Sequence, residues 1–547
     1  MASQLIHNTG HVLLKLRGDM LRFSSQPQFI QQWPNSENDG QIVMSTFLKS
    51  PVCVIAILLT IFGLVKLWRS LFTPSLVLVP GVPVVGKPTD TSFEAAIREG
   101  DTKYPDEPYQ IPLPVMPTVF FPNKCIPELF NNPAASFQAH TDEILLGEYT
   151  YQGEDNPELK GGIRLMSRNL DITIDSFVAD VEFAFQQCFG DCSDWVTLDH
   201  LWPTTFRMAA ILSSRPFLGS SLSHNKEWVE SVLAFAMTLS NAVGTLRGLP
   251  KLFRFLFEER LPRIRAMVEA RNRCEDMMMP LIEEHIERWR ANGGPSVAPK
   301  DAKTHPDGGE LLDFIIPHYS EPKAKKLARD EITVILESML NLSSGLSHVL
   351  YTMAKYGHIY GEDLRQEYLE AIGEDGKLTT NAMFKMRKMD SFMKETQRIN
   401  PPSLMAMQRK IVPPRGHQFS VGPPIPQGTL VAVSADRVNT DPNIYPEPFS
   451  FDAYRFLRMR EQPGEEFKHQ HVSTSQIELN FSYGGRACPG RIFFAAMEKV
   501  VLSHILMHYE VRVKPGYEHE DSRWIDGIRC TTNPNAIMQI RRKVAKA

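Results

Sequence analysis

Hydrophobic residues recur at a helical period through most of the chain from about residue 170 to residue 400. The longest such runs cover residues 228–242, 261–292 and 327–356. Beyond them, residues 409–457 alternate short β-like runs, such as 429–434, with proline-rich turns. A last helix is expected over residues 491–508, followed by a β-rich tail. The pattern predicts a mainly α domain with small β-sheets.

A separate apolar run, PVCVIAILLTIFGLVKL at residues 51–67, has Lys66 as its only charge. Its length with flanking residues predicts a transmembrane anchor over 44–72. The alternatives are a buried core helix and the apolar part of a secretory signal, which would begin nearer residue 1. Lys66 lies at the end of the run and Arg69 and Lys87 follow it, whereas Lys49 is the only base in the twenty residues before it. This asymmetry predicts a single-pass protein whose C-terminal part is cytoplasmic.

The predicted anchor divides the chain. Residues 1–43 form an N-terminal segment of unclear role, whose weak amphipathic pattern is similar to that of a mitochondrial presequence. Residues 73–90 contain VPGVPVVGKP and are expected to be a stiff proline-rich connector. Residues 91–547 are expected to be one large catalytic domain.

Composition excludes several classes of protein. The 547 residues carry a formal net charge of -4, which offers no electrostatic attraction to nucleic acid. The seven cysteines include no C-x-x-C pair, so a zinc or dithiol redox site is not indicated. A G-x-G-x-x-G dinucleotide fingerprint is also absent from the sequence.

The candidate chemistry lies at residues 481–491, FSYGGRACPGR, immediately before the last predicted helix. The N–H groups at a helix start lower the pKa of a cysteine, so this position favours a thiolate. A lone cysteine is otherwise often a small buried apolar residue. The run fits the pattern F-x-x-G-x-R-x-C-x-G through the residues Phe481, Gly484, Arg486, Cys488 and Gly490. It resembles the haem-thiolate signature of the cytochrome P450 family.

A second motif lies upstream in MRKMDSFMKETQRINPP, where Glu395 and Arg398 stand three residues apart on one helix face. Taken alone, such a pair is usually a solvated surface pair. Here it resembles the family's E-x-x-R, and FSFDAYRF resembles the segment whose arginine, Arg455, completes that cluster. The resemblance covers about residues 75–545 and extends to fungal membrane-anchored members of terpenoid and other secondary metabolism.

The resemblance implies a cytochrome P450 fold that binds haem b (heme), with Cys488 as the axial thiolate ligand of the iron. It implies that Arg486 and Arg409 face the haem propionates, with Arg164 or Arg168 as further candidates, and that Phe481 packs near the sulfur. It also implies that a cluster of three residues holds the cysteine loop without taking part in chemistry: Glu395, Arg398 and Arg455.

The chain departs from the family in the helix expected over 327–356. Leu340 stands where the family has an acid or histidine, and Asn341 stands where it has threonine. Asn341 is therefore a candidate for the residue that holds water beside the oxygen site. Ser343 or Ser344 would serve if the helix were distorted by bonding to its own carbonyls. The alternative is that these side chains merely face a neighbouring helix.

The expected function is a monooxygenase that oxidises a lipophilic small molecule with O2 and electrons from NADPH through a separate cytochrome P450 reductase. Met339, residues 403–407 and residues 228–256 are expected to line an apolar pocket, and 246–257 to dip into the membrane, which is expected to be that of the endoplasmic reticulum. The alternatives are a haem-thiolate enzyme that rearranges, dehydrates or couples its substrate without oxygen insertion, and a non-catalytic haem or ligand-binding membrane protein.

Overall fold

A computed structural model describes residues 78–114, 116–153, 156–249, 260–296 and 309–544, together with Gly63 and Arg254. The predicted anchor at 44–72 and the segment 1–43 lie outside the described range, apart from Gly63. The proline-rich connector is described only from residue 78 onward.

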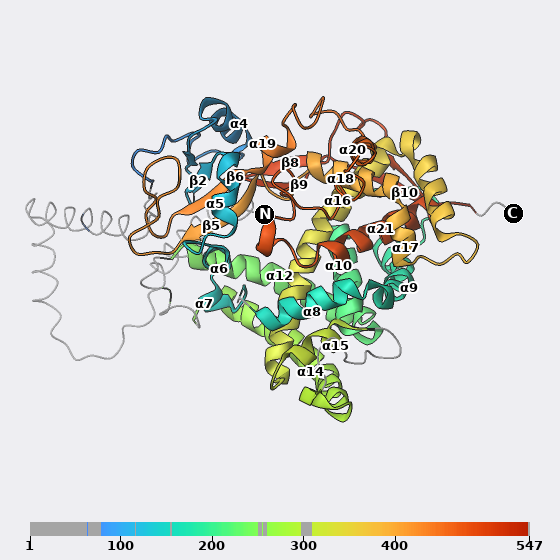
Figure 1. Cartoon of the computed structure of the whole chain (residues 1–547). Helices are drawn as coiled ribbons and strands as arrows, with labels where there is room; N and C mark the ends of the chain where they lie inside the picture. The colour runs from blue at the N-terminus through green and yellow to red at the C-terminus, as the bar shows by residue number, and fades with distance from the viewer. Residues whose placement is uncertain are drawn as a thin grey trace, which may run out of the picture.

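Helices make up most of the described chain and surround one long central helix (Figure 1). They are α4 (Glu94–Lys103), α5 (Ile126–Phe130), α6 (Phe137–Leu145), α7 (Gly147–Thr150), α8 (Pro157–Arg168), α9 (Leu170–Phe189), α10 (Leu201–Leu218), α11 (Ser220–Ser223), α12 (Lys226–Arg247), α14 (Pro262–Ala291), α15 (Leu311–Ile315), α16 (Ala324–Ile372), α17 (Thr380–Lys385), α18 (Arg387–Ile399), α19 (Ala435–Asn439), α20 (Arg455–Arg460) and α21 (Arg491–His508).

The strands form small sheets. The largest has the order β1 (Tyr109–Ile111), β2 (Thr118–Phe121), β6 (Leu430–Ser434), β5 (Met405–Ile411) and β3 (Ala135–Ser136). Another joins β4 (Val196–Leu198), β10 (Met538–Arg542) and β7 (Tyr509–Val513), and a hairpin joins β8 (Arg523–Asp526) to β9 (Arg529–Thr532). In the largest sheet only the pair β2 and β6 is parallel. The five-stranded sheet and α4 to α5 lie to one side of the helices in Figure 1.

The mainly α fold with small sheets is confirmed. The runs predicted at 228–242, 261–292 and 327–356 are α12, α14 and the middle of α16, and the last helix has the predicted bounds. The helix α16 is longer than predicted at both ends because its sequence contains no proline, and it stops where Gly373 adopts a positive φ of 60°.

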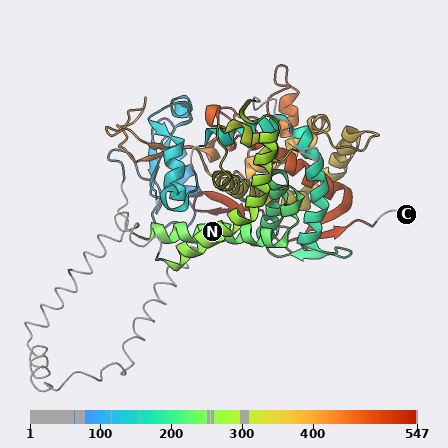
Figure 2. The same ribbon diagram turned by 90° about the horizontal axis from the view of Figure 1, so that it is seen from below.

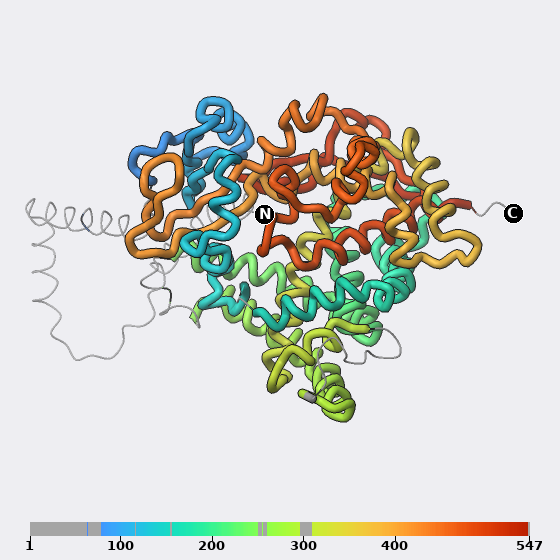
Figure 3. The backbone as a smooth tube through the Cα atoms, in the orientation of Figure 1, coloured from blue at the N-terminus to red at the C-terminus, as the bar shows by residue number. Residues whose placement is uncertain are grey.

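The long helix α16 passes through the middle of the domain, as the turned view and the tube trace show (Figures 2 and 3). It contacts α10, α14, α18 and α21 and joins their apolar faces into one core. Between α10 and α16, Ser213 and Ser338 lie 2.9 Å apart, and Thr205 and Ser347 lie 2.6 Å apart. These hydroxyl pairs fix the register of the two helices along their mainly apolar contact.

Among the described residues, one helix is long and apolar enough to cross a membrane, namely α12. It packs against α10 and α14, and its Trp228 is completely buried and donates to Ser214 over 2.8 Å. These contacts make α12 a core helix of the domain. The predicted anchor at 44–72 is a different segment, and the finding for α12 does not test it.

A buried histidine joins the end of α14 to the start of α15. Its Nδ1 lies 2.9 Å from Asp313 and its Nε2 forms an ion pair of 2.8 Å with Glu310, and His285 itself is 3% exposed. Burial opposes the charged form, but the hydrogen bonds and charges of the two carboxylates outweigh it and raise the pKa of His285 to about 9. The histidine is therefore a buried cation between two anions.

We expect His285→Gln to lower the free energy of unfolding by about 3 kcal/mol below pH 6. Because the pKa is raised above its unfolded value of about 6.5, the stabilisation is complete below that value and disappears as the pH rises through about 9. Thermal unfolding of the full chain in detergent between pH 6 and pH 10 measures this. His519→Gln, an exposed histidine beside Glu520, is the control. A difference that does not change with pH would contradict the assignment.

Candidate functional site

The cysteine loop is closed by its own backbone. The Cys488 N–H donates to the Phe481 carbonyl over 2.9 Å, and the short 3₁₀ turn Gly484–Arg486 lies between them. Gly484 has a φ of 73°, and a Cβ at this position would stand 2.2 Å from the Phe130 ring. Only glycine fits both constraints. The motif glycine therefore lets the loop pass close to α5.

The sulfur of Cys488 lies at the start of α21. The backbone N–H groups of Gly490 and Arg491 lie close enough to lower its pKa, and the Arg491 side chain donates to the Cys488 carbonyl over 2.8 Å. The sequence predicted a lowered thiol pKa here. In the structure burial raises the pKa of the Cys488 thiol and outweighs both N–H groups. A metal cation at the sulfur reverses this balance and stabilises the predicted thiolate.

Arg409 reaches the same region from β5. A register shift between Ala406 and Arg409 and the positive φ of Met407 (54°) mark a bulge in this strand. Arg409 is 2% exposed, and its Nη1 donates to the Gln408 carbonyl over 2.7 Å. Its Nη2 has no hydrogen-bond partner among the described residues. A buried guanidinium with an unused donor marks a site for an anion.

The charge of Arg486 strengthens this conclusion. Burial, together with the nearby charge of Arg486, lowers the pKa of Arg409 to about 10. Two like charges placed together favour a ligand that carries carboxylates. A sulfur with backbone N–H donors and two arginines therefore fit a flat ligand with a metal and two acidic groups. This donor set fits haem, which the resemblance predicted.

One face of α16 opens toward this region. From Asp330 to Gly357 the only exposed residues are Glu337 and Asn341, one helical turn apart. A further turn along, a Cβ at Gly345 would lie 2.3 Å from a Glu498 carboxyl oxygen of α21. The three positions share a face. That face therefore points toward the helix that follows Cys488.

The three residues predicted at the oxygen site differ in their exposure on α16. Asn341 lies on the open face, where its Nδ2 donates to the Glu337 carbonyl over 2.8 Å. Ser343 is completely buried and donates to the Leu340 carbonyl over 2.9 Å, so its hydroxyl is used within the helix. Ser344 is half-buried. Asn341 and Ser344 are therefore the more accessible of the three predicted residues, and the predicted role of Ser343 stays untested.

The sequence analysis missed two charged residues of this region. The charge of Glu337 reaches Cys488, and the charge of Lys160 on α8 reaches Glu337. The available signal was a lone acid inside the apolar run ITVILESML. Arg164 and Arg168, the basic residues considered on α8, are exposed.

The residues expected to line an apolar pocket are mostly packed in the core. Met339 is 0% exposed, and Met405 and Met407 are 7% and 2% exposed. Of the segment 246–257, Leu246 is buried and most of the rest lies outside the described residues. The membrane-interface role of that segment is therefore an untested prediction.

The structure brings Glu395, Arg398 and Arg455 into one buried cluster. Arg398 forms a two-pronged contact with the Glu395 carboxylate at 2.7 and 2.8 Å, and Arg455 reaches it at 3.1 Å. Glu395 is 0% exposed. The alternative of a solvated surface pair is wrong.

The cluster contacts the chain between α19 and α20 rather than the cysteine loop. Its arginines donate to carbonyls of that segment: Asn439, Pro446, Glu447, Pro448 and Ser450. The connection toward the cysteine runs through Asn439, whose Nδ2 donates to Asn480 over 3.2 Å, one residue before Phe481.

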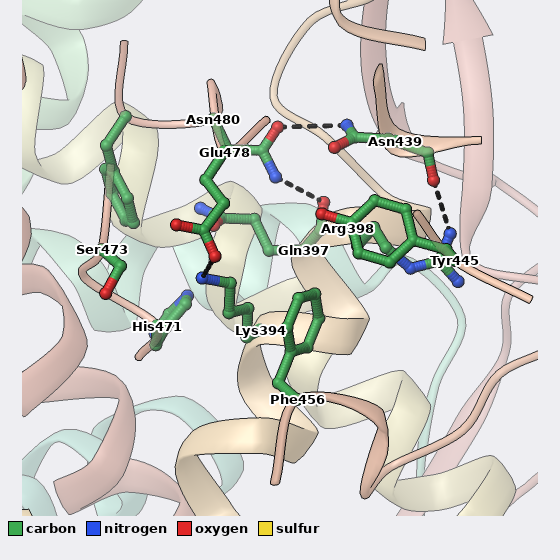
Figure 4. A pocket seen from close by; sticks show the side chains of 11 residues that line it. Lys394, Gln397, Arg398, Asn439, Tyr445, Phe456, His471, Ser473, Glu478 and Asn480 are labelled. Carbon is green, nitrogen blue, oxygen red and sulfur yellow. Dashed lines mark hydrogen bonds and ion pairs between the residues drawn. The ribbon is translucent and has the colours of Figure 1, made fainter. Parts of the chain in front are cut away.

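A small polar hollow lies beside this connection (Figure 4). Lys394 points across it to Glu478 at 2.6 Å, and Asn480 donates to the Gln397 carbonyl over 3.3 Å. Both bonds join α18 to the chain immediately before the cysteine loop. The loop is thus held to α18 on a path that passes the cluster.

Comparisons with known proteins agree with this geometry. The family model described as Cytochrome P450 matches residues 203–537. The chain is 34% identical to "Cytochrome P450 monooxygenase ataF" of Aspergillus terreus, over 77% of this chain and 85% of the relative. It is 30% identical to "Cytochrome P450 monooxygenase gliF" of Aspergillus fumigatus, over 85% and 92%.

Two further similarities extend the comparison. The chain is 29% identical to "Pyrichalasin C-18 hydroxylase" of Pyricularia grisea, over 83% of this chain and 86% of the relative. The solved structure of retinoic acid bound cyanobacterial CYP120A1 superposes with a TM-score of 0.56 at 17% identity, covering 85% of this chain and all of that one. The last similarity concerns the fold alone.

We expect Glu395→Gln to destabilise the protein by about 3–5 kcal/mol, because two buried arginines then lose their shared anion. Thermal unfolding of the full chain measures the loss. Glu99→Gln is the matched control, since Glu99 forms an exposed helical pair with Lys103 at 2.5 Å, and a change below about 0.5 kcal/mol is expected there. Equal effects of the two substitutions would contradict a supporting role for the cluster.

Proposed function

This chain belongs to the cytochrome P450 family of haem-thiolate oxidoreductases, and we propose that it is a membrane-anchored monooxygenase that oxidises a lipophilic small molecule of secondary metabolism. Electrons come from NADPH through a separate reductase in this proposal. The observation that carries it is the Cys488 sulfur at the start of α21, with Arg409 and Arg486 together nearby.

Each residue of the site has a stated task in the proposed reaction. Haem bound through Cys488 supplies the activation of dioxygen. The N–H groups of Gly490 and Arg491 favour the charged sulfur, and Arg409 and Arg486 would bind the two propionates. Phe481, whose ring lies 5.6 Å from that of Phe494, covers the loop and limits the access of water.

Asn341 and Ser344 are the proposed residues on the oxygen side. The amide of Asn341 donates to its own helix, which leaves its Oδ1 as an acceptor for water on the open face. An amide holds a water without passing a proton itself. Peroxide released per product, compared between the wild type and Asn341→Leu, tests this role, and equal values would exclude Asn341.

The membrane anchor at 44–72 and an endoplasmic reticulum location with a cytoplasmic catalytic domain are part of the proposal. Their support is the apolar run at 51–67 and the positive charge that follows it. Resistance of the full chain to alkaline extraction from microsomes tests the anchor, and release of the protein would exclude it.

The second candidate function is rearrangement, dehydration or coupling without oxygen insertion. Leu340 and Asn341, which replace the family's usual acid and threonine, are the observation in its favour. One relative is named "Pyrichalasin C-18 hydroxylase", and a hydroxylase inserts oxygen, so this similarity supports the first candidate function instead.

We expect the reduced, carbon-monoxide-bound protein to show the long-wavelength Soret band of a thiolate-bound haem, and Cys488→Ala to lose it. The sulfur is the only axial donor that the motif provides. Difference spectra of microsomes measure the band. Cys274→Ala is the control, because Cys274 is completely buried in α14 and should leave the band unchanged. A band that survives in Cys488→Ala would remove the central claim.

We further expect product formation in microsomes containing this chain and a P450 reductase to require both NADPH and O2. Feeding lipophilic candidates under isotopically labelled dioxygen should place the label in the product. Product analysis by mass spectrometry with and without each component measures this. Unlabelled product that forms without NADPH would favour the second candidate function.

A further inference from the structure

The central stretch of α16 has two exposed residues, Glu337 and Asn341, and Glu337 is the acid of the pair. Residues on either side along the helix are buried or half-buried, so this is not the solvent face of a surface helix. Placing an acid among buried residues costs free energy unless its carboxyl group is hydrogen-bonded or paired.

The carboxyl group of Glu337 is nevertheless surrounded by protein. Burial raises its pKa, and the charge of Lys160 opposes that rise. A side chain that is accessible to solvent and also enclosed does not stand on the open outer surface of the domain. Glu337 therefore projects into the interior rather than into bulk water.

Glu337 lies on the side of α16 that faces the Cys488 region. The charge of Glu337 acts on the Cys488 sulfur. Asn341, on the same face, donates to the Glu337 backbone carbonyl, and Gly345 lets α16 approach α21 closely. Glu337 thus lies within the site that the proposed function assigns to haem and substrate.

Within the described part of the chain, the Glu337 carboxyl has no hydrogen-bond partner. The charge of Lys160 acts on this carboxyl group and favours its ionised form. An enclosed acid without a hydrogen-bond partner is stabilised by a ligand that donates a hydrogen bond to it. Binding sites that are mostly apolar use a few such groups to fix ligand orientation.

We propose that Glu337 is a substrate-binding residue that accepts a hydrogen bond from an N–H or O–H group of the substrate. The substrate is then a lipophilic molecule that carries a hydrogen-bond donor, and a pure hydrocarbon such as a simple terpene is disfavoured. This inference rests on the proposed function and adds the polarity of its substrate.

The test compares probes that differ in one donor. Adamantane carboxamide has N–H groups, whereas the methyl ester of adamantane carboxylic acid has a similar shape and none. Binding of each to the full, haem-loaded chain is followed by the shift of its Soret band, without turnover. We expect the wild type to prefer the amide about 10- to 100-fold, the effect of one charge-assisted hydrogen bond.

Variants assign that preference to one side chain. Glu337→Ala should abolish it, and Glu337→Gln, which keeps an acceptor oxygen, should retain part of it. Glu331→Gln is the matched control and should keep the full preference. Glu331 is a completely buried acid on the same helix without a hydrogen-bond partner among the described residues, and the charges that act on it are Asp330 and Glu310.

Three outcomes overturn the inference. They are a wild type with no preference for the amide, a preference that survives in Glu337→Ala, and an equal loss in Glu331→Gln. In each of these the carbon-monoxide band of the wild type remains, so the proposed function stands. Absence of that band in the wild type would overturn the proposed function, and this inference with it.

Discussion

The arrangement of the site depends on one buried carboxylate shared by two arginines. Glu395 is completely excluded from solvent, and its two oxygens satisfy Arg398 and Arg455 at once. Those arginines use their remaining donors on backbone carbonyls between α19 and α20, a stretch with little regular structure of its own. Because each group compensates another, the loss of one leaves a buried charge behind. The irregular chain that leads to the cysteine loop is therefore ordered by electrostatics more than by secondary structure.

The residues around Cys488 include two basic side chains and one acid. Arg409 and Arg486 gather positive charge near the sulfur, where an anionic ring fits, while Glu337 supplies the acid on the face of α16. Arg409 is buried, and the loss of water around its charge lowers its pKa to about 10. The thiol shows the same effect, since enclosure raises the pKa of Cys488 despite two N–H donors. Protein alone favours the neutral thiol, and the metal supplies the charge that makes the thiolate stable.

Periodicity was enough to predict the fold class, because an apolar stripe has few ways to be buried along a helix as long as α16 or α14. The motif around Cys488 located the loop because its glycine at 484 is required by a local contact, the close approach of the Phe130 ring. The rest depended on tertiary structure. Whether a residue of α16 faces α10 or the site depends on how the helices cross, which separated Asn341 from Ser343. The contacts of Arg398 with distant carbonyls and the burial of the thiol also come from packing, and no short run of sequence encodes them.

The unusual residues of α16 have one common explanation. Leu340 and Asn341 remove the family's acid and hydroxyl, yet the helix gains an acid one turn before Asn341. The two polar side chains now lie on one open face, joined through the bond from Asn341 to the Glu337 carbonyl. A polar stripe in that position gives up apolar contact with a substrate, which is unfavourable for a hydrocarbon and favourable for a molecule with its own donors. The departure from the family pattern is therefore better explained as a change in what the site binds than as a loss of function.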